Sequence, residues 1–268
     1  MGAKNFTASE LLEMSPKEFR SIARQGQAIH TSRVCRGYAQ ANLAIVPRDV
    51  AFEFLVFCNR NPRACPVIDV TEPGNPHPPR VAPEADLRTD LGKYRVYKDG
   101  KLVDEPSDIR DYWRDDLVGF LLGCSYSFDW LMRAANVKFR FIGAFPTNIP
   151  CVPAGPFSGH VVVSCRFFKD SEEAVRAIQI SSRVPAVHGA PIHIGDPLLI
   201  GIKDLYSYRT DFLTEPPAPQ EPDEIALYWG CGLTAQVVAV ESKLPLMITH
   251  YPGTMFVTDK RVEELAIL

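Results

Sequence analysis

Short blocks of apolar residues, separated by polar and proline-rich stretches, predict a chain that alternates between helices and strands. At the N-terminal end, Thr7 lies three residues before Glu10, and Ser15 lies three residues before Glu18. This spacing is typical of a capping box, in which a hydroxyl and a carboxylate satisfy free backbone N–H groups where a helix begins. Two short helices are therefore expected before Gly26, which can end the second one.

The next elements are predicted to be a helix, a strand, a loop and a hairpin. The helix should begin at Pro47 and end before Asn61, because a proline follows that residue. Its buried residues are expected to be Phe52, Phe54, Leu55 and Val56. Residues 66–70 are typical of a short buried strand, and the prolines within residues 71–88 predict a loop. Asp99-Gly100 favours a tight turn between two hairpin strands.

In the middle of the chain, apolar residues at four-residue steps predict an amphipathic helix. They are Ile109, Trp113, Leu117 and Leu121. A second helix is expected from Ser127 to Asn136, with the Ser127 hydroxyl as its cap. Further apolar blocks predict strands at residues 139–145, 161–168 and 198–202, and a helix at residues 171–180.

Near the C-terminal end, the pattern predicts a strand at residues 225–229, a helix at residues 234–242 and a strand at residues 246–249. A strand–helix–strand order is typical of a βαβ unit with parallel strands. Ligands bind at the carboxyl ends of such strands. The order therefore predicts that Cys231, Thr234 and His250 lie at one edge of a sheet.

Composition narrows the class of partner. Apolar residues make up 46% of the chain, the formal net charge is −3, and Lys and Arg form no cluster. These values predict a globular protein that binds neither nucleic acid nor a membrane. The seven cysteines include no C-x-x-C pair. Their irregular spacing favours free thiols and a cytoplasmic location.

Several segments resemble those of a family of proposed hydro-lyases that is related to the N-terminal module of D-glutamate cyclase. The segments are Gly37–Asn42, Arg88–Leu91, Gly123–Phe128, Thr147–Ile149, Ala154–Gly159, Val162–Ser164, His188–Gly195, Trp229–Gly232, Ile248–His250, Pro252-Gly253 and Thr258-Asp259. They follow one another in order over nearly the whole chain, which makes the resemblance more specific than any single motif.

The resemblance implies an α/β fold, with a three-layer core built on a mixed sheet and a smaller two-layer α/β subdomain. On this basis residues 1–125 and 195–268 are expected to form the core domain, and residues 126–194 the inserted subdomain. It also implies a reaction that removes water from a small amino acid or carboxylate. If the reaction follows D-glutamate cyclase, an amine attacks a side-chain carboxyl group and a lactam, 5-oxoproline, is formed.

The residues at 123–127 are a candidate site for the substrate carboxylate. A helix that begins near Ser127 presents free N–H groups and a partial positive charge, which favours an anion. Cys124 and Ser125 would lie beside it. The alternative is a buried turn between helices, in which Cys124 is a small apolar side chain. Arg166 could add a charged fork, or form a structural ion pair.

Histidines are the candidates for proton transfer. His188 and His193 flank a Gly-Ala-Pro turn, and His250 ends a predicted strand. Each could move a proton, whereas hydrogen bonding within the structure is the alternative use. His188 and His193 together with Asp196 lack the spacing of a metal site, so no metal and no organic cofactor are expected. The other candidate substrate contacts are Asn148, Cys231 and Thr234.

Three functional hypotheses follow from these residues. The first is a hydro-lyase acting on a small carboxylate or amino acid. The second is a non-catalytic module that binds such a carboxylate beside an enzyme of amino-acid metabolism. The third is a cysteine-dependent hydrolase that uses Cys231 or Cys124. A homo-oligomer is compatible with all three.

Overall fold

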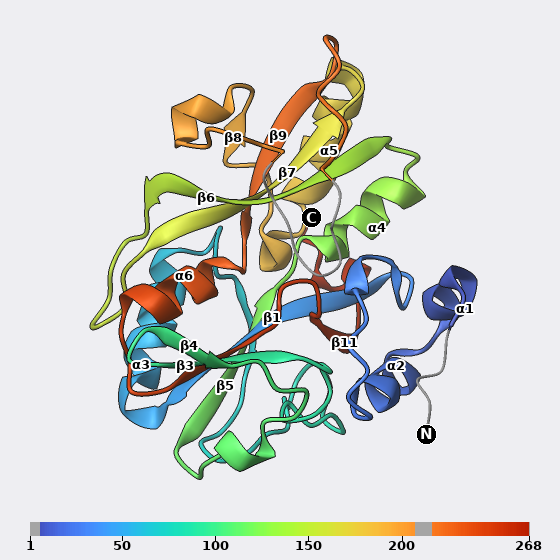
Figure 1. Cartoon of the computed structure of the whole chain (residues 1–268). Helices are drawn as coiled ribbons and strands as arrows, with labels where there is room; N and C mark the ends of the chain where they lie inside the picture. Colours follow the sequence, from blue (N-terminus) through green and yellow to red (C-terminus); the bar gives the residue numbers. More distant parts are fainter. Residues whose placement is uncertain (1–5, 207–215, 268) are drawn as a thin grey trace.

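The computed structural model describes residues 6–206 and 216–267, and its strands form two sheets (Figure 1). The seven-stranded sheet consists of β1 (Tyr38–Pro47), β2 (Val67–Val70), β3 (Tyr94–Lys98), β4 (Lys101–Asp104), β5 (Leu117–Gly123), β10 (Met247–His250) and β11 (Phe256–Arg261). The four-stranded sheet consists of β6 (Phe139–Pro150), β7 (His160–Phe168), β8 (His193–Ile194) and β9 (Ile225–Cys231).

The described α-helices are α1 (Ala8–Glu13), α2 (Pro16–Ala23), α3 (Arg48–Arg60), α4 (Tyr126–Ala134), α5 (Ser171–Ser182) and α6 (Thr234–Glu241). The described 3-10 turns are η1 (Thr31–Arg33), η2 (Arg110–Tyr112), η3 (Pro185–Val187), η4 (Pro197–Ile200) and η5 (Val262–Leu265). The predicted α/β class is therefore confirmed. No helix in the described part of the chain is long and apolar enough to span a membrane.

The elements predicted from local chemistry are confirmed. Both capping boxes are present, at Thr7 with Glu10 and at Ser15 with Glu18. The strands β3 and β4 form the hairpin, and Asp99 in its turn has a φ of 50°. The strand predictions at residues 66–70, 139–145 and 161–168, and the helix at residues 171–180, also match elements of the structure.

The strands of the predicted βαβ unit do not pair. β9 lies in the four-stranded sheet and β10 in the seven-stranded sheet, and α6 carries the chain from one sheet to the other (Figure 1). Every strand pairing among the described residues is antiparallel. The prediction of parallel strands, and with it a mixed sheet, is wrong for this part of the chain.

The predicted helix across Ile109 to Leu121 is wrong as well. Residues 110–112 form only the η2 turn, and residues 117–123 form β5, which lies between β1 and β2. All seven residues of β5 are buried. A strand that is covered on both faces needs a continuous apolar run, and that run produced the four-residue spacing by coincidence.

Two smaller predictions are corrected. Residues 198–202 do not form a strand, because the Asp196 side chain accepts a hydrogen bond from the Leu198 N–H at 2.9 Å and starts the η4 turn. Leu198 is 63% exposed there. In α3 the buried stripe is Phe54, Phe57 and Cys58, so Phe52 and Leu55 point outward instead of into the core.

One buried cluster extends across both sheets. It contains Phe54 of α3, Phe120 of β5, and Val163 and Tyr228 of the four-stranded sheet. On the other face of the four-stranded sheet, α4 and α5 pack over a second buried cluster that includes Trp229. The division into residues 1–125 with 195–268 and residues 126–194 stays a prediction. The four-stranded sheet takes its strand β9 from outside the second range.

Candidate functional site

A narrow pocket, partly open to solvent, lies where the two sheets meet. The end of β5 and the start of α4 supply Cys124, Ser125 and Tyr126. The end of β9 and the turn into α6 supply Cys231 and Leu233. The remaining lining residues are Asn42, Phe141, Ala144, Ser164, Gly253 and Met255.

Glycines beside the two cysteines allow each of these segments to approach another part of the chain closely. A Cβ atom at Gly123 would lie 1.9 Å from the carbonyl oxygen of Ala186. One at Gly232 would lie 2.1 Å from Nδ2 of Asn42. Any larger residue would push β5 away from η3 at Gly123, and the turn after β9 away from β1 at Gly232.

A buried ion pair lies behind the pocket. Arg166 of β7 is fully buried, and its Nε and Nη2 atoms donate to Oδ1 and Oδ2 of Asp129 at 2.8 Å and 3.1 Å. Burial raises the pKa of Asp129, and the guanidinium of Arg166 opposes that shift. Arg166 therefore forms a structural ion pair, which was the alternative to a fork for the substrate carboxylate.

The remaining guanidinium donors of Arg166 bond to two hydroxyls that line the pocket. Nη1 donates to Ser164 Oγ at 2.9 Å, and Nη2 donates to Ser125 Oγ at 3.1 Å. The Ser164 hydroxyl in turn donates to Ser125 Oγ at 3.4 Å. Ser125 Oγ thus accepts twice, and its own proton remains available to an acceptor in the pocket.

The two thiols of the pocket have matching surroundings. Burial raises the pKa of Cys124, whereas the Tyr126 backbone N–H and the charge of Arg166 oppose the shift. Burial raises the pKa of Cys231 to about 11, and there the Leu233 N–H and Arg166 oppose it. In each case the opposing N–H comes from two residues further on, where a helix begins.

A family model described as D-glutamate cyclase matches residues 118–259, which is more than half of the chain and includes both cysteines of the pocket. The chain belongs to the D-glutamate cyclase family. It is 51% identical over 262 residues to a protein of Geobacillus kaustophilus, covering 95% of this chain and 98% of that protein. It is 48% identical over 262 residues to YcsI of Bacillus subtilis, covering 95% and 100%. Both relatives are named as proposed hydro-lyases.

The histidines that the sequence nominated in this family member do not line the pocket. His188 follows η3 with a φ of 85°, and its Nδ1 lies 2.9 Å from the carbonyl oxygen of Arg63. The Nδ1 atom of His250 accepts a hydrogen bond from the Leu43 N–H at 3.2 Å. Both side chains are fully buried, and burial lowers the pKa of each to about 4. The expected convergence on one pocket therefore holds for Cys124 and Ser125 but not for these histidines.

Four further candidates lie outside the pocket lining. His193 lies on the edge strand β8, where Nε2 is 2.8 Å from the carbonyl oxygen of Asp196. Asn148 is exposed on β6. Thr234 Oγ1 donates to the Cys231 carbonyl oxygen at 2.7 Å and accepts from the Val162 N–H at 3.0 Å. Thr234 thus fixes the turn that carries Cys231.

Ser127, the remaining candidate, is buried and bonds to the backbone of β1. Its hydroxyl accepts from the Gln40 N–H at 2.9 Å, and the helix α4 begins one residue earlier, at Tyr126. The predicted capping role of Ser127 is therefore wrong, because the hydroxyl is used to attach α4 to the neighbouring strand. Ser125 occupies the cap position, without a hydrogen bond from its side chain to the helix.

Sequence reasoning did not select Asn42, Ser164 and Tyr126 as site residues. Asn42 and Ser164 lie within segments that carry the family resemblance, which was the available signal. Tyr126 Oη lies 3.4 Å from Nε2 of His30, and burial lowers the pKa of His30 to about 4. A neutral His30 can therefore exchange a hydrogen bond with the tyrosine behind the pocket wall.

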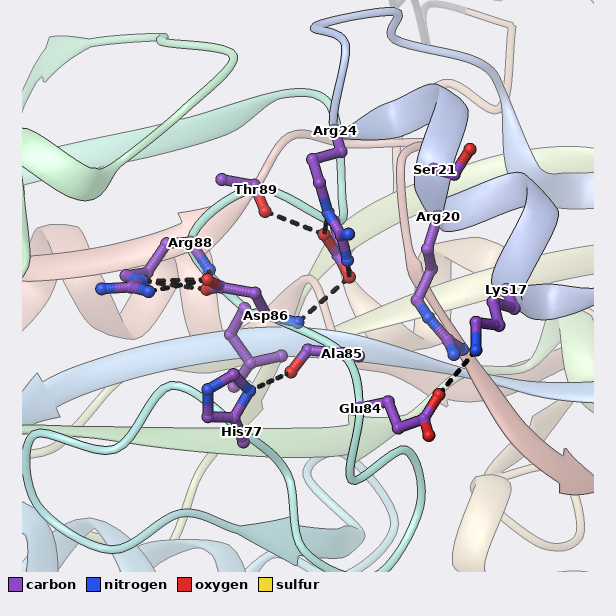
Figure 2. A network of polar contacts seen from close by, with 12 residues as sticks. Lys17, Arg20, Ser21, Arg24, His77, Glu84, Ala85, Asp86, Arg88 and Thr89 are labelled. Carbon is purple, nitrogen blue, oxygen red and sulfur yellow. Dashed lines mark hydrogen bonds and ion pairs between the residues drawn. The ribbon is translucent and has the colours of Figure 1, made fainter.

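The segment Arg88–Leu91 has a structural role at a distance from the pocket lining. Arg24 of α2 donates from Nε and Nη2 to the buried carboxylate of Asp90 at 2.8 Å and 2.7 Å. Figure 2 shows this network, together with the paired contacts between Arg88 and Asp86. It ties α2 to the long loop that precedes β3. Within residues 6–206 and 216–267, no three His, Cys, Asp or Glu side chains gather in a way that could hold a metal ion.

Proposed function

We propose that the protein removes water from a small amino-acid-like carboxylate bound in the pocket between the two sheets, and that D-glutamate is its substrate. The observation that carries the proposal is the arrangement of Cys124, Ser125 and Cys231 around one opening, within the segment that matches the D-glutamate cyclase family.

Hydrogen-bond donors support binding of a carboxylate. The Ser125 hydroxyl has a proton to donate, and its oxygen is polarised by Arg166. The start of α4 lies beside it and favours negative charge. The side-chain nitrogen of Asn42 already bonds to the carbonyl oxygens of Leu122 and Gly123, which leaves its own carbonyl oxygen to accept from a substrate ammonium group.

The chemistry of lactam formation sets what the pocket must supply. The substrate amine attacks its side-chain carboxyl carbon and water departs, which needs a base, an acid and donors for the developing oxyanion. Of the described residues in the pocket lining, those that can gain or lose a proton are Cys124, Tyr126 and Cys231. His188, His193 and His250 do not line the pocket, so each could affect the reaction only through residues that lie between it and the pocket. A catalytic role for these histidines stays a prediction.

The experiment follows D-glutamate, L-glutamate and 5-oxoproline by chromatography, with thermal shift as the measure of binding. Formation of 5-oxoproline from D-glutamate supports the proposal. Ser125→Ala should weaken binding at least tenfold, while Ser127→Ala is the matched control, because its buried hydroxyl bonds to Gln40 and does not line the pocket. A thermal shift without any lactam would favour the alternative, a non-catalytic carboxylate-binding module.

A further inference from the structure

We infer that Cys124 and Cys231 form a pair of proton-transfer groups that removes and returns the α-hydrogen of a bound amino acid, so that the protein also interconverts enantiomers. The inference relies on the proposed function for the class of ligand. It adds a second activity, inversion at the α-carbon, which the loss of water to form a lactam does not require.

The first support is where the two thiols come from. Cys124 follows β5 of the seven-stranded sheet, and Cys231 ends β9 of the four-stranded sheet. They reach one pocket because the two sheets meet there, with Gly232 allowing the turn after β9 to approach Asn42 of β1. A ligand in the pocket is therefore in contact with thiols that belong to two separate walls.

The second support is that the same kinds of interaction affect the pKa of both thiols. In each case burial raises the pKa of the thiol, and the backbone N–H two residues later and the charge of Arg166 oppose that shift. Interactions of these two kinds favour a thiolate.

The third support is the lack of another base in the pocket lining. Among the described residues of the lining there is no Asp, Glu or His, and Tyr126 is the sole other titratable side chain. A nucleophilic cysteine normally needs a separate base next to it. A pair of thiols needs none, because one acts as the base while the other acts as the acid.

The proposed step conserves atoms and charge. The step starts from the form in which one cysteine has lost its proton to solvent, a minor fraction at neutral pH because burial raises the pKa of both thiols. This thiolate takes the α-hydrogen as a proton, leaving an electron pair on the α-carbon that is delocalised into the carboxylate. The other cysteine, as a thiol, gives its proton to the opposite face of that carbon and becomes the thiolate. The substrate carboxylate is held by Ser125, whose donated hydrogen bond grows stronger as the negative charge on the carboxylate increases.

The test is incubation of D-glutamate and, separately, L-glutamate with the full chain in ²H₂O, followed by proton NMR and chiral chromatography. The expected result is that the opposite enantiomer appears and carries deuterium at the α-carbon, while the remaining substrate keeps its hydrogen at early times. Cys124→Ser and Cys231→Ser should each reduce inversion at least 100-fold. Each variant should still exchange the α-hydrogen of one enantiomer, the one whose hydrogen faces the remaining thiol.

Cys165→Ala is the matched control, because Cys165 is buried on β7 but does not line the pocket. It should invert glutamate at the wild-type rate. Inversion that persists in either pocket variant, or no α-exchange by the wild-type protein with either enantiomer, would overturn the inference. Thermal melting of each variant shows whether it is folded, so that loss of inversion caused by the missing thiol can be distinguished from loss caused by unfolding. Lactam formation without α-hydrogen exchange would support the proposed function and contradict the inference of a thiol pair. Exchange without lactam formation would support the thiol pair and contradict the proposed function.

Discussion

The guanidinium of Arg166 and the carboxylate of Asp129 meet through two hydrogen bonds, of 2.8 Å and 3.1 Å, in the buried space between β7 and α4. Both side chains lie almost entirely out of contact with water. The rings of Phe128, Phe141 and Trp229 surround the guanidinium. The pair fixes the helix that carries Ser125 against the strand that carries Ser164, so it determines the shape of the pocket.

Removing one partner of this pair should destabilise the fold. Asp129→Ala leaves a buried guanidinium without its counter-charge, which typically costs about 3–5 kcal/mol. We expect a decrease of that size in the free energy of unfolding, measured by urea denaturation. Asp116→Ala is the control, because its partner Arg114 and Asp116 itself are each about half exposed. It should change the free energy of unfolding by less than about 1 kcal/mol. Equal effects would contradict a buried role for Asp129.

Stability should fall in mild acid because of two buried histidines. Burial lowers the pKa of His188 and of His250 from 6.5 to about 4, and the partly buried His30 adds a shift of the same direction and size. The unfolded chain therefore binds protons between pH 6.5 and about 4 that the folded chain does not, and the free energy of unfolding decreases as the pH falls through that range. Each histidine can account for up to about 3 kcal/mol above pH 6.5.

Urea denaturation from pH 4 to pH 8 tests this dependence. His188→Asn and His250→Asn should each flatten the curve of unfolding free energy against pH. His193→Asn is the control, because His193 lies half-buried on an edge strand, and its curve should run parallel to that of the wild type. Curves of equal slope in all four proteins would show that the two buried histidines are not the source.

The sequence predicted those parts of the fold that depend on neighbours in the chain. The capping boxes need only a hydroxyl and a carboxylate three residues apart, and the hairpin needs only Asp99-Gly100. The strand β5 could not be predicted in the same way, because its state depends on β1 and β2, which cover its two edges. The run Leu117–Gly123 fits both a helix and a strand until its partners are known.

The candidate site shows the same difference between features that depend on neighbours in the chain and features that depend on packing. Cys124, Ser125 and Cys231 were nominated from motifs at the ends of predicted elements, and the structure places them in one pocket. The Asp129 partner of Arg166 was not predicted, because the two residues lie far apart in the chain and meet only through packing. His250 was misplaced because the prediction put β9 and β10 in one sheet.

The backbone at His188 should reveal whether this residue serves the fold or the chemistry. Its φ of 85° lies in the left-handed region, which glycine adopts at little cost. His188→Ala loses the ring contact with the Arg63 carbonyl and keeps the backbone strain, whereas His188→Gly loses the contact but relieves the strain. We expect the glycine variant to be more stable than the alanine variant by about 1 kcal/mol. Binding of D-glutamate should be retained in both, and loss of binding in a folded variant would indicate a role in the site.

Alkylation should identify Cys231 as the most accessible thiol. The other six cysteines are buried, whereas Cys231 is partly exposed in the pocket. Because burial raises its pKa to about 11, the thiolate fraction should increase about tenfold for each unit of pH between 8 and 10. Iodoacetamide should therefore label Cys231 first, as detected by peptide mass spectrometry. The rate of labelling should increase about tenfold for each unit of pH, as the thiolate fraction does.

A ligand in the pocket should slow this labelling. Saturating glutamate should protect Cys231 at least tenfold, because the thiol lines the space that the ligand occupies. In the Cys231→Ser variant the early label should disappear instead of moving to another residue, since no remaining cysteine is exposed. Labelling that begins at Cys35 or Cys58, both deeply buried in the fold, would mean that the protein opens before it reacts. Labelling of Cys231 that glutamate does not affect would place the ligand elsewhere.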